Sequence, residues 1–213
     1  MSKLSKIAKG LSAAMLLSAV GAVQAETVNV PASVTVDNTI GLALTGTLDF
    51  GTVRATPDET VDECSGIVMP ANPASALSAY APGAGAPCVT GAGVSEVQSV
   101  GGTPTRPQFD ISGVAAFATL NVTVPNTAVN LTTTAPAGSP GFQLIDFTAY
   151  KTTGTAAAIP LTAGAGTISV DGTGNASFTV GATLITDPTA YALTTATYEN
   201  AAYNGSFDVA VTY

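Results

Sequence analysis

Few side chains in this sequence are suited to catalysis. The chain of 213 residues contains no histidine, so a Ser-His-Asp or Cys-His nucleophile system and a histidine metal ligand are excluded. Beyond the first nine residues the only lysine is Lys151, which lies beside Tyr150 and lacks the SxxK spacing of a Ser-Lys dyad. Carboxylate pairs remain available among 14 acidic residues, but the chain has no tryptophan for a sugar-binding platform. We therefore expect no enzyme activity and no cofactor, and we keep a secreted hydrolase as an alternative.

The chain has two cysteines, Cys64 and Cys88. They lack a CxxC spacing and have no histidine beside them, so a disulfide is the preferred interpretation over a catalytic or metal-binding thiol. Closing a loop of this length would stabilise the fold by roughly 3 kcal/mol. The acidic segment 58–63 lies just before Cys64 and offers carboxylates to calcium, but it lacks the D-x-D-x-D-G ladder of a calcium loop. We interpret it as a solvated loop and leave calcium binding open.

The first 25 residues have the pattern of a secretory signal peptide. Three lysines precede an apolar run at 11–20, and Val23-Gln24-Ala25 forms a small-residue cleavage site. The apolar run is too short to span a bilayer, although an N-terminal membrane anchor stays an alternative. The sequence thus predicts export through the periplasm, with a mature chain of 188 residues (213 − 25) that begins at Glu26.

Removal of that peptide would change the charge balance. Arg54, Arg106 and Lys151 would remain against all 14 acidic residues, which gives a net charge of −11 (3 − 14). Phosphate binding needs clustered Lys and Arg, so we expect no nucleic acid partner and no attraction to an anionic membrane surface. Hydrophobic residues make up 46% of the chain, enough to bury a core, so we expect a folded domain rather than disorder.

The elements that would position these residues are β-strands. Between Thr27 and Ile40, six of the seven even-numbered positions are apolar, and this period of two predicts a strand with one buried face. Further stretches rich in Val, Thr, Phe and Ile are separated by Gly, Pro and Asn. They are 47–53, 108–113, 119–124, 129–133, 142–150, 167–170, 176–185 and 206–213. Asp171-Gly172 predicts a hairpin turn between two of them. Short strands at this spacing predict an all-β sandwich, formed as a single domain over 26–213.

One region does not follow this pattern. From Arg54 to Pro107 the chain is rich in Pro, Ala and Gly, contains both cysteines, and shows little alternation beyond Gly66 to Met69. A loop of this length inside a compact domain would be unusual without a constraint. We therefore expect a long surface excursion at 54–107, pinned by the disulfide, with at most a short edge strand and no part in the core.

The two ends of the predicted domain carry the most informative patterns. The C-terminal segment alternates apolar with polar residues up to the last position, and its apolar members are Phe207, Val209, Val211 and Tyr213. At the other end, Thr27 to Ile40 would extend about 46 Å at about 3.3 Å per residue, longer than a typical globular strand. It is either an ordinary first strand bent at Pro31 or a segment whose distal part adds to the sheet of a neighbouring molecule. The apolar residues of that distal part are Val28, Val30, Ala32, Val34 and Val36.

Three motifs resemble a known protein family. The segment from Val28 to Leu42, VNVPASVTVDNTIGL, resembles the mature N-terminus of the major subunits of chaperone-usher fimbriae, particularly the colonisation-factor type. The ending from Tyr203 to Tyr213, YNGSFDVAVTY, is similar to the C-terminal strand of these subunits. The segment 47–53, TLDFGTV, is similar to one found in exported bacterial proteins of pilin-like or unassigned function. The resemblance covers the two ends of the chain and not its middle.

The resemblance implies an immunoglobulin-like β-sandwich that lacks its last strand. In the family a periplasmic chaperone fills the gap, an outer-membrane usher catalyses exchange, and the N-terminal extension of the next subunit completes the fold. Residues 26–36 would then be the donor strand, and the strand from Phe207 to Tyr213 would line the acceptor groove.

A homopolymer of this kind would form a cell-surface filament, or pilus, with a role in adhesion or biofilm formation and with a host or abiotic surface as its ligand. A self-contained secreted β-sandwich, acting as an adhesin or matrix protein, is the alternative from a different functional class.

Overall fold

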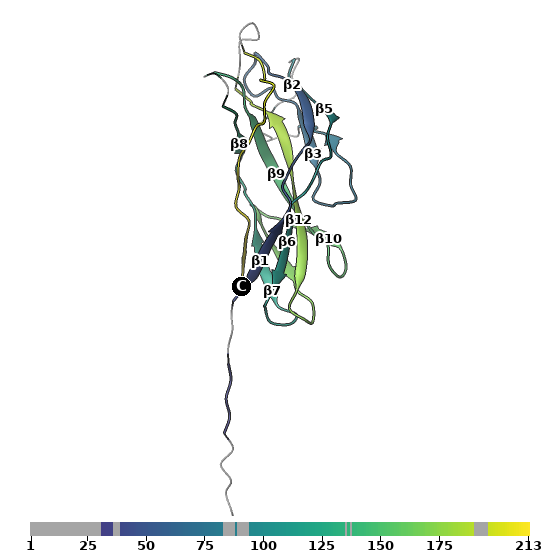
Figure 1. The fold of residues 1–213 in the computed structure, drawn as a ribbon, viewed down its shortest axis with the longest axis vertical. Helices are drawn as coiled ribbons and strands as arrows, with labels where there is room; N and C mark the ends of the chain where they lie inside the picture. Colours follow the sequence, from purple (N-terminus) through teal and green to yellow (C-terminus); the bar gives the residue numbers. More distant parts are fainter. Residues whose placement is uncertain are drawn as a thin grey trace, which may run out of the picture. The chain divides into compact units, whose positions relative to one another are not determined.

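The computed structural model describes residues 31–35, 39–82, 88, 94–134, 136, 138–189 and 196–213. Within these ranges the regular secondary structure is all β-strand, without a helix (Figure 1). The chain divides into two compact units, residues 1–36 and residues 37–213. The first unit is described only from Pro31 to Thr35, and those five residues are exposed and form no strand. All strands described below belong to the second unit.

The larger sheet is built around β12 (Ala176–Thr186), its longest strand. One edge of β12 pairs first with β6 (Gln108–Ser112) and then with β3 (Gly66–Met69). The other edge pairs with β9 (Phe142–Lys151). The outer strands are β1 (Gly41–Thr45) on β6, β4 (Ser78–Ala79) on β3, and β8 (Val129–Leu131) and β10 (Ala157–Ile159) on β9. Every pair in this sheet is antiparallel.

A smaller sheet places β7 (Thr119–Thr123) between β11 (Ala165–Ser169) and β13 (Ala210–Thr212). A separate ribbon pairs β2 (Thr52–Thr56) with β5 (Glu96–Gly101). The core joins the two main sheets, because side chains of β7 and β11 share one hydrophobic cluster with side chains of β6, β9 and β12. Within it the rings of Phe109 and Phe178 stack with centroids 5.1 Å apart. The predicted all-β sandwich is confirmed.

Most strands lie where the period of two predicts them. The predicted stretches 108–113, 119–124, 129–133, 142–150 and 176–185 contain β6, β7, β8, β9 and β12, with ends that differ by a few residues at most. In β7 the alternation matches burial directly, because Leu120 and Val122 are fully buried while the residues beside them are exposed. The prediction at 47–53 is displaced, since the strand begins only at Thr52 after a turn in which the Asp49 carboxylate accepts a hydrogen bond from the Gly51 backbone N–H.

The long strand predicted for Thr27 to Ile40 is wrong over the described residues. Residues 31–35, Thr39 and Ile40 form no strand, and β1 begins at Gly41, which pairs with Ser112. A strand needs a hydrogen-bonded partner as well as alternating side chains, and β6 supplies one only from Gly41 onward. The residues 27–30 and 36–38 lie outside the described ranges.

The prediction that the region 54–107 takes no part in the core is also wrong. Its β3 strand lies within the large sheet, and Ile67, Met69 and Val97 are buried in the main cluster. Gly181 of β12 permits this approach, because a Cβ at that position would collide with the carbonyl oxygen of Met69. β3 has only four residues, which is too short a run for alternation in the sequence to indicate that the strand is buried.

The turn predicted at Asp171-Gly172 is present, but it does not close a hairpin. The Asp171 carboxylate accepts hydrogen bonds from the backbone N–H groups of Thr173 (2.8 Å) and Asn175 (3.0 Å), which closes the turn locally. The strands on either side, β11 and β12, pair in different sheets. The turn therefore carries the chain from one layer of the sandwich to the other.

Candidate functional site

The first strand of the domain has one unpaired edge. Among the described residues β1 pairs with β6 alone, so its other edge has no strand beside it. Leu42 and Leu44 on this strand are 40% and 62% exposed. An open edge with exposed leucines is a surface on which another strand can pair.

The C-terminal segment, residues 203–213, also has one paired edge. Asn204 forms a bridge with Thr132 just beyond β8, and β13 pairs with β7 through Ala210 and Thr123. Gly205 permits the approach to β8, since a Cβ there would lie 2.6 Å from the carbonyl oxygen of Asn130. In the described part of the chain, no strand pairs with the opposite edge of this segment.

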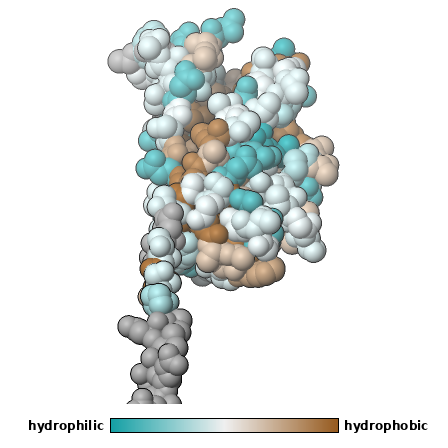
Figure 2. All heavy atoms as spheres, turned by 60° about the horizontal axis from the view of Figure 1, so that its bottom comes forward, coloured by the Kyte–Doolittle hydropathy of each residue, from teal (hydrophilic) through white to brown (hydrophobic). Residues whose placement is uncertain are grey.

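A groove of about 1260 Å³ lies between these two stretches of chain. One wall is formed by Leu44 and residues 46–55, and the other by residues 198–207. Core side chains line its floor, among them Phe109, Phe142, Leu144 and Leu184. On the face drawn in Figure 2, hydrophobic atoms form a band between paler and more polar surfaces. We refer to the groove defined by these lining residues as the open groove.

The predicted alternation of the C-terminal segment is present in its burial. Phe207, Val209 and Val211 are half-buried and pack against the main core, while the residues between them are exposed. The ring of Phe207 lies 4.9 Å from the ring of Phe147, centroid to centroid. Tyr213 remains 50% exposed. Of these four residues the lining of the open groove includes Phe207. The acceptor role of all four stays a prediction.

Three aromatic side chains in the lining of the open groove contact one another. Phe142 stacks on Tyr198 at 4.4 Å and meets Tyr203 edge-on at 5.0 Å, centroid to centroid. The Tyr203 hydroxyl accepts a hydrogen bond of 2.8 Å from the Glu199 backbone N–H, and burial raises the pKa of this tyrosine. The Tyr198 hydroxyl donates to the Gly141 carbonyl at 2.8 Å. Sequence reasoning missed Phe142 and Tyr198 because their spacing along the chain gives no sign that they meet.

The predicted donor residues are described only in part. Ala32 and Val34 are exposed, Val34 to 87%, and neither lies in a strand. Val28, Val30 and Val36 lie outside the described residues. A valine with this much exposed surface leaves apolar area in water, although single exposed apolar residues are common on protein surfaces. The donor role of the segment stays a prediction.

The predicted disulfide between Cys64 and Cys88 is present, with the two Cα atoms 5.3 Å apart. Both cysteines are buried in a second small cluster with Ile145 and Ile185. Ile185 is the member of this cluster that belongs to β12, so the cluster covers one end of that strand outside the main core.

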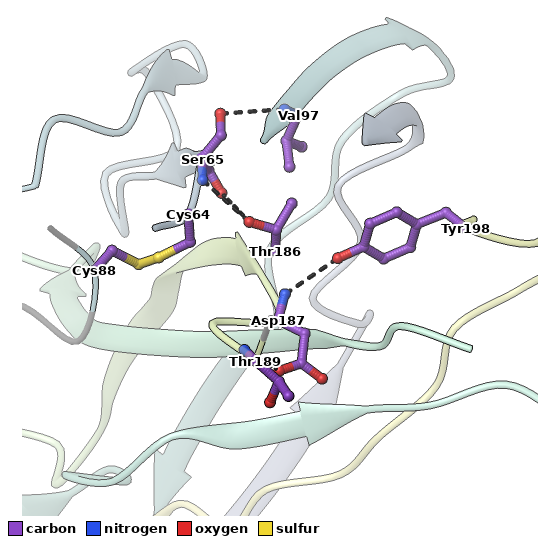
Figure 3. Close-up of a disulfide and its surroundings, with 8 residues drawn as sticks. All are labelled: Cys64, Ser65, Cys88, Val97, Thr186, Asp187, Thr189 and Tyr198. Atoms are coloured by element: carbon purple, nitrogen blue, oxygen red, sulfur yellow. Dashed lines mark hydrogen bonds between the residues drawn. A yellow bond between two sulfur atoms is a disulfide. The ribbon is translucent and has the colours of Figure 1, made fainter. Parts of the chain in front are cut away.

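The residue after Cys64 ties this region to the sheet. Figure 3 shows Ser65 between Val97 and Thr186. The Ser65 hydroxyl accepts from the Val97 N–H at 3.2 Å, and its carbonyl accepts from the Thr186 N–H at 2.9 Å. The disulfide-bearing segment is therefore fixed to β5 and to the end of β12, so it forms part of the packed structure.

The acidic segment 58–63 has a structural role through its first residue. Asp58 is 2% exposed, and its carboxylate accepts hydrogen bonds from the backbone N–H groups of Thr60 (2.9 Å), Val94 (2.5 Å) and Ser95 (2.9 Å). Burial alone would raise its pKa, but these backbone donors outweigh burial and the pKa is lowered. Asp58 thereby holds residues 58–60, which precede the disulfide-bonded cysteines in the sequence, against residues 94–95, which follow them.

No three His, Cys, Asp or Glu side chains of the described ranges come close enough together to share a metal ion. Those ranges also contain no helix with the length and apolarity needed to cross a membrane. No family model matches the chain, and neither a curated protein nor a solved structure matches it. The open groove is thus the feature on which a functional proposal for this chain is built.

Proposed function

We propose that this chain is the structural subunit of a bacterial surface filament, in which residues 26–36 of one copy complete the β-sandwich of the next copy. The open groove carries this proposal. It lies between β1 and the C-terminal segment, each of which has an edge without a strand partner among the described residues. An extended segment inserted there would pair with both edges and bury apolar side chains on the floor of the groove.

The length and pattern of the proposed donor suit this groove. Residues 26–36 and residues 203–213 each comprise 11 residues (36 − 26 + 1 and 213 − 203 + 1), and such a strand extends roughly 36 Å. Alternate donor residues are apolar, as a strand with one buried face requires. Burial of four or five such side chains contributes on the order of 10 kcal/mol before entropy costs. The stability gained by each subunit would then come from its neighbour.

The proposal includes protein partners at each stage of assembly. Unpaired sheet edges beside an apolar groove favour aggregation, so a periplasmic chaperone would cover them and an outer-membrane usher would exchange it for the donor strand. The predicted signal peptide supports this route, and a disulfide suits an oxidising compartment. Insertion of one copy into the next is a heterologous contact that does not close, so it produces an open filament. The proposed role is structural and not enzymatic, with adhesion or biofilm formation as its outcome.

A pair of matched substitutions tests this function. Val34→Asp would place a carboxylate on the buried face of the donor strand, which costs several kcal/mol without a partner. Thr35→Asp adds the same charge on the opposite face and serves as the control. We expect electron micrographs to show filaments on cells producing the native chain or Thr35→Asp, and none with Val34→Asp, at equal periplasmic levels of subunit. Native cells without filaments, or normal filaments with Val34→Asp, would instead favour a self-contained secreted adhesin or matrix protein.

A further inference from the structure

We propose that the side chains of Ser177 and Gln108 join in an ester bond between β12 and β6, with Asp110 as the proton carrier. This inference concerns a covalent modification of the folded domain and does not depend on filament assembly. It starts from a hydroxyl, a carboxylate and a carboxamide that two hydrogen bonds bring together.

The three side chains meet where β6 pairs with β12. The Ser177 hydroxyl donates a hydrogen bond of 2.5 Å to the Asp110 Oδ1 atom. The Gln108 Nε2 atom donates a hydrogen bond of 2.9 Å to the same oxygen. One carboxylate oxygen therefore contacts both a nucleophile and the nitrogen that would leave an acyl group. Acyl transfer to a hydroxyl requires these three groups within hydrogen-bond reach of one another.

The register of the two strands fixes this arrangement. Ser177 lies directly opposite Asp110, between two pairs of residues that are buried in the main core. The Ser177 carbonyl accepts from the Thr152 N–H, and the Ser177 N–H donates to the Thr153 hydroxyl, both at 2.9 Å. Its backbone hydrogen bonds thus point away from β6, and opposite Asp110 it forms a non-hydrogen-bonded pair, in which facing side chains lie closest. A slip of the register would expose the neighbouring core residues, so the two side chains are held together.

Gln108 is placed so that its amide can reach the Ser177 hydroxyl. Residues 108 and 110 are two apart on β6 and project from the same face, which makes Gln108 the diagonal neighbour of Ser177. Another hydroxyl, that of Thr179, lies opposite Gln108, but it is buried and donates to the Ala71 carbonyl at 2.7 Å. Ser177 and Gln108 are half-buried, which limits the access of water as a competing nucleophile.

The reaction needs no further reactant. Asp110 accepts the proton of the Ser177 hydroxyl while the Oγ atom attacks the Gln108 Cδ atom and forms the new C–O bond. The bond between Cδ and Nε2 then breaks, and Asp110 returns the proton to the leaving nitrogen. The products are the ester and one molecule of ammonia, which takes up a proton at neutral pH and diffuses away, so the reverse reaction is suppressed. Because the fold holds the groups together, no bimolecular encounter is required.

An ester at this position would join the two central strands of the larger sheet covalently. β6 would stay on β12 even when the hydrogen bonds between them open. β6 also carries β1, whose Leu44 lines the open groove. The bond would therefore strengthen the attachment of one wall of the groove to the centre of the sheet.

The intact mass of the purified chain, measured after reduction of the disulfide, tests for this bond. We expect a mass lower by one ammonia than the mass calculated from the sequence between the measured chain ends. Peptide mapping should find one fragment that joins residues 108 and 177. Ser177→Ala removes the nucleophile and Asp110→Asn removes the proton carrier, so both variants should have the full calculated mass. Ser177→Thr keeps a hydroxyl and should retain the loss of ammonia.

Ser169→Ala is the matched control, because it removes a serine hydroxyl from β11, in the smaller sheet, and should also retain the loss. Asn-Gly pairs lose ammonia by cyclisation, and Asn204-Gly205 is such a pair, so the peptide map identifies the source. A loss located at Asn204, or one that persists in Ser177→Ala, would overturn the ester.

A native chain with the full calculated mass would also overturn it and would leave the three side chains as a hydrogen-bonded network only. This measurement uses the native chain, so the proposal can be refuted even where a variant does not fold. Neither result affects the proposed function, which the filaments of Val34→Asp test separately.

Discussion

The ring of Tyr203 meets the ring of Phe142 edge-on, with centroids 5.0 Å apart. Phe142 belongs to β9 in the large sheet, and Tyr203 begins the segment that continues to β13 in the small sheet. Both rings line the open groove. The contact therefore fixes the start of the C-terminal segment against the larger layer, and it holds one wall of the groove in place.

Removal of the Tyr203 ring should loosen that wall. We expect Tyr203→Ala to lower the free energy of unfolding by about 3 kcal/mol, because a half-buried aromatic contact is lost. Tyr203→Phe keeps the ring and removes the hydrogen bond from the Glu199 N–H, so it should cost about 1 kcal/mol. Urea unfolding of the purified chain measures both. Equal losses for the two variants would contradict the assignment of the effect to ring packing.

We predict that a charge on the half-buried face of the C-terminal segment has a different effect from the same charge on its exposed face. Val209→Asp places a carboxylate on the half-buried face that packs against the core, and it should abolish surface filaments and deplete the periplasmic subunit. Ala210→Asp adds the same charge one residue along, on the exposed face of β13, and should leave filaments in place. Electron microscopy and immunoblots of periplasmic extracts provide the readout. Normal filaments with Val209→Asp would show that this strand does not form the acceptor.

The disulfide can be tested by mass and by stability. The intact mass of the native chain should be lower by two hydrogens than that of the reduced chain, since Cys64 and Cys88 are joined. Replacing both cysteines by serine should lower the free energy of unfolding by about 3 kcal/mol. Serine hydroxyls would also disturb the small cluster with Ile145 and Ile185, which adds to this loss, so reduction without substitution should cost less than the double substitution. Two free thiols in the native protein would refute the bridge.

We predict that Asp58 contributes to the free energy of unfolding at neutral pH and that acid removes this contribution. Its pKa is lowered in the fold, so the carboxylate stabilises the native state above the pKa of the unfolded chain and loses this effect as pH falls through the folded pKa. Asp58→Asn should cost about 1 to 3 kcal/mol at neutral pH, because an amide cannot accept all of the backbone N–H groups that the carboxylate holds.

Thermal unfolding between pH 3 and pH 7 measures this contribution. The loss of stability on acidification should be smaller in Asp58→Asn than in the native chain. Glu59→Gln removes an exposed neighbouring carboxylate and serves as the charge-matched control. Parallel profiles for the native chain and Asp58→Asn would rule out the role given to Asp58.

Local pattern was enough to predict the β class and most central strands. In β7, and in β9 from Ile145 to Ala149, neighbouring side chains alternate between buried and exposed, so a period of two is visible in the sequence. β12 was also found, because its Val, Ile and Phe content favours a strand although both of its faces are buried.

The local sequence pattern did not predict the parts of the structure that depend on contacts between residues far apart in the sequence. β3 is short, and its place in the sheet depends on Gly181, which lies more than one hundred residues further along the chain. The meeting of Phe142, Tyr198 and Tyr203 likewise depends on the path of three separate segments. In the candidate site, the apolar alternation of residues 207–213 was visible in the sequence, whereas the wall formed by Leu44 and residues 46–55 was not.

The structure of the assembled filament by cryo-electron microscopy tests the central claim most directly. We predict that residues 26–36 of one copy form a strand in the open groove of its neighbour, paired with β1 on one side and with residues 203–213 on the other. The side chains of Val34 and Val36 should point toward Phe109 and Leu144 on its floor. A filament in which this segment stays with its own domain, or in which the groove between copies is empty, would contradict the account.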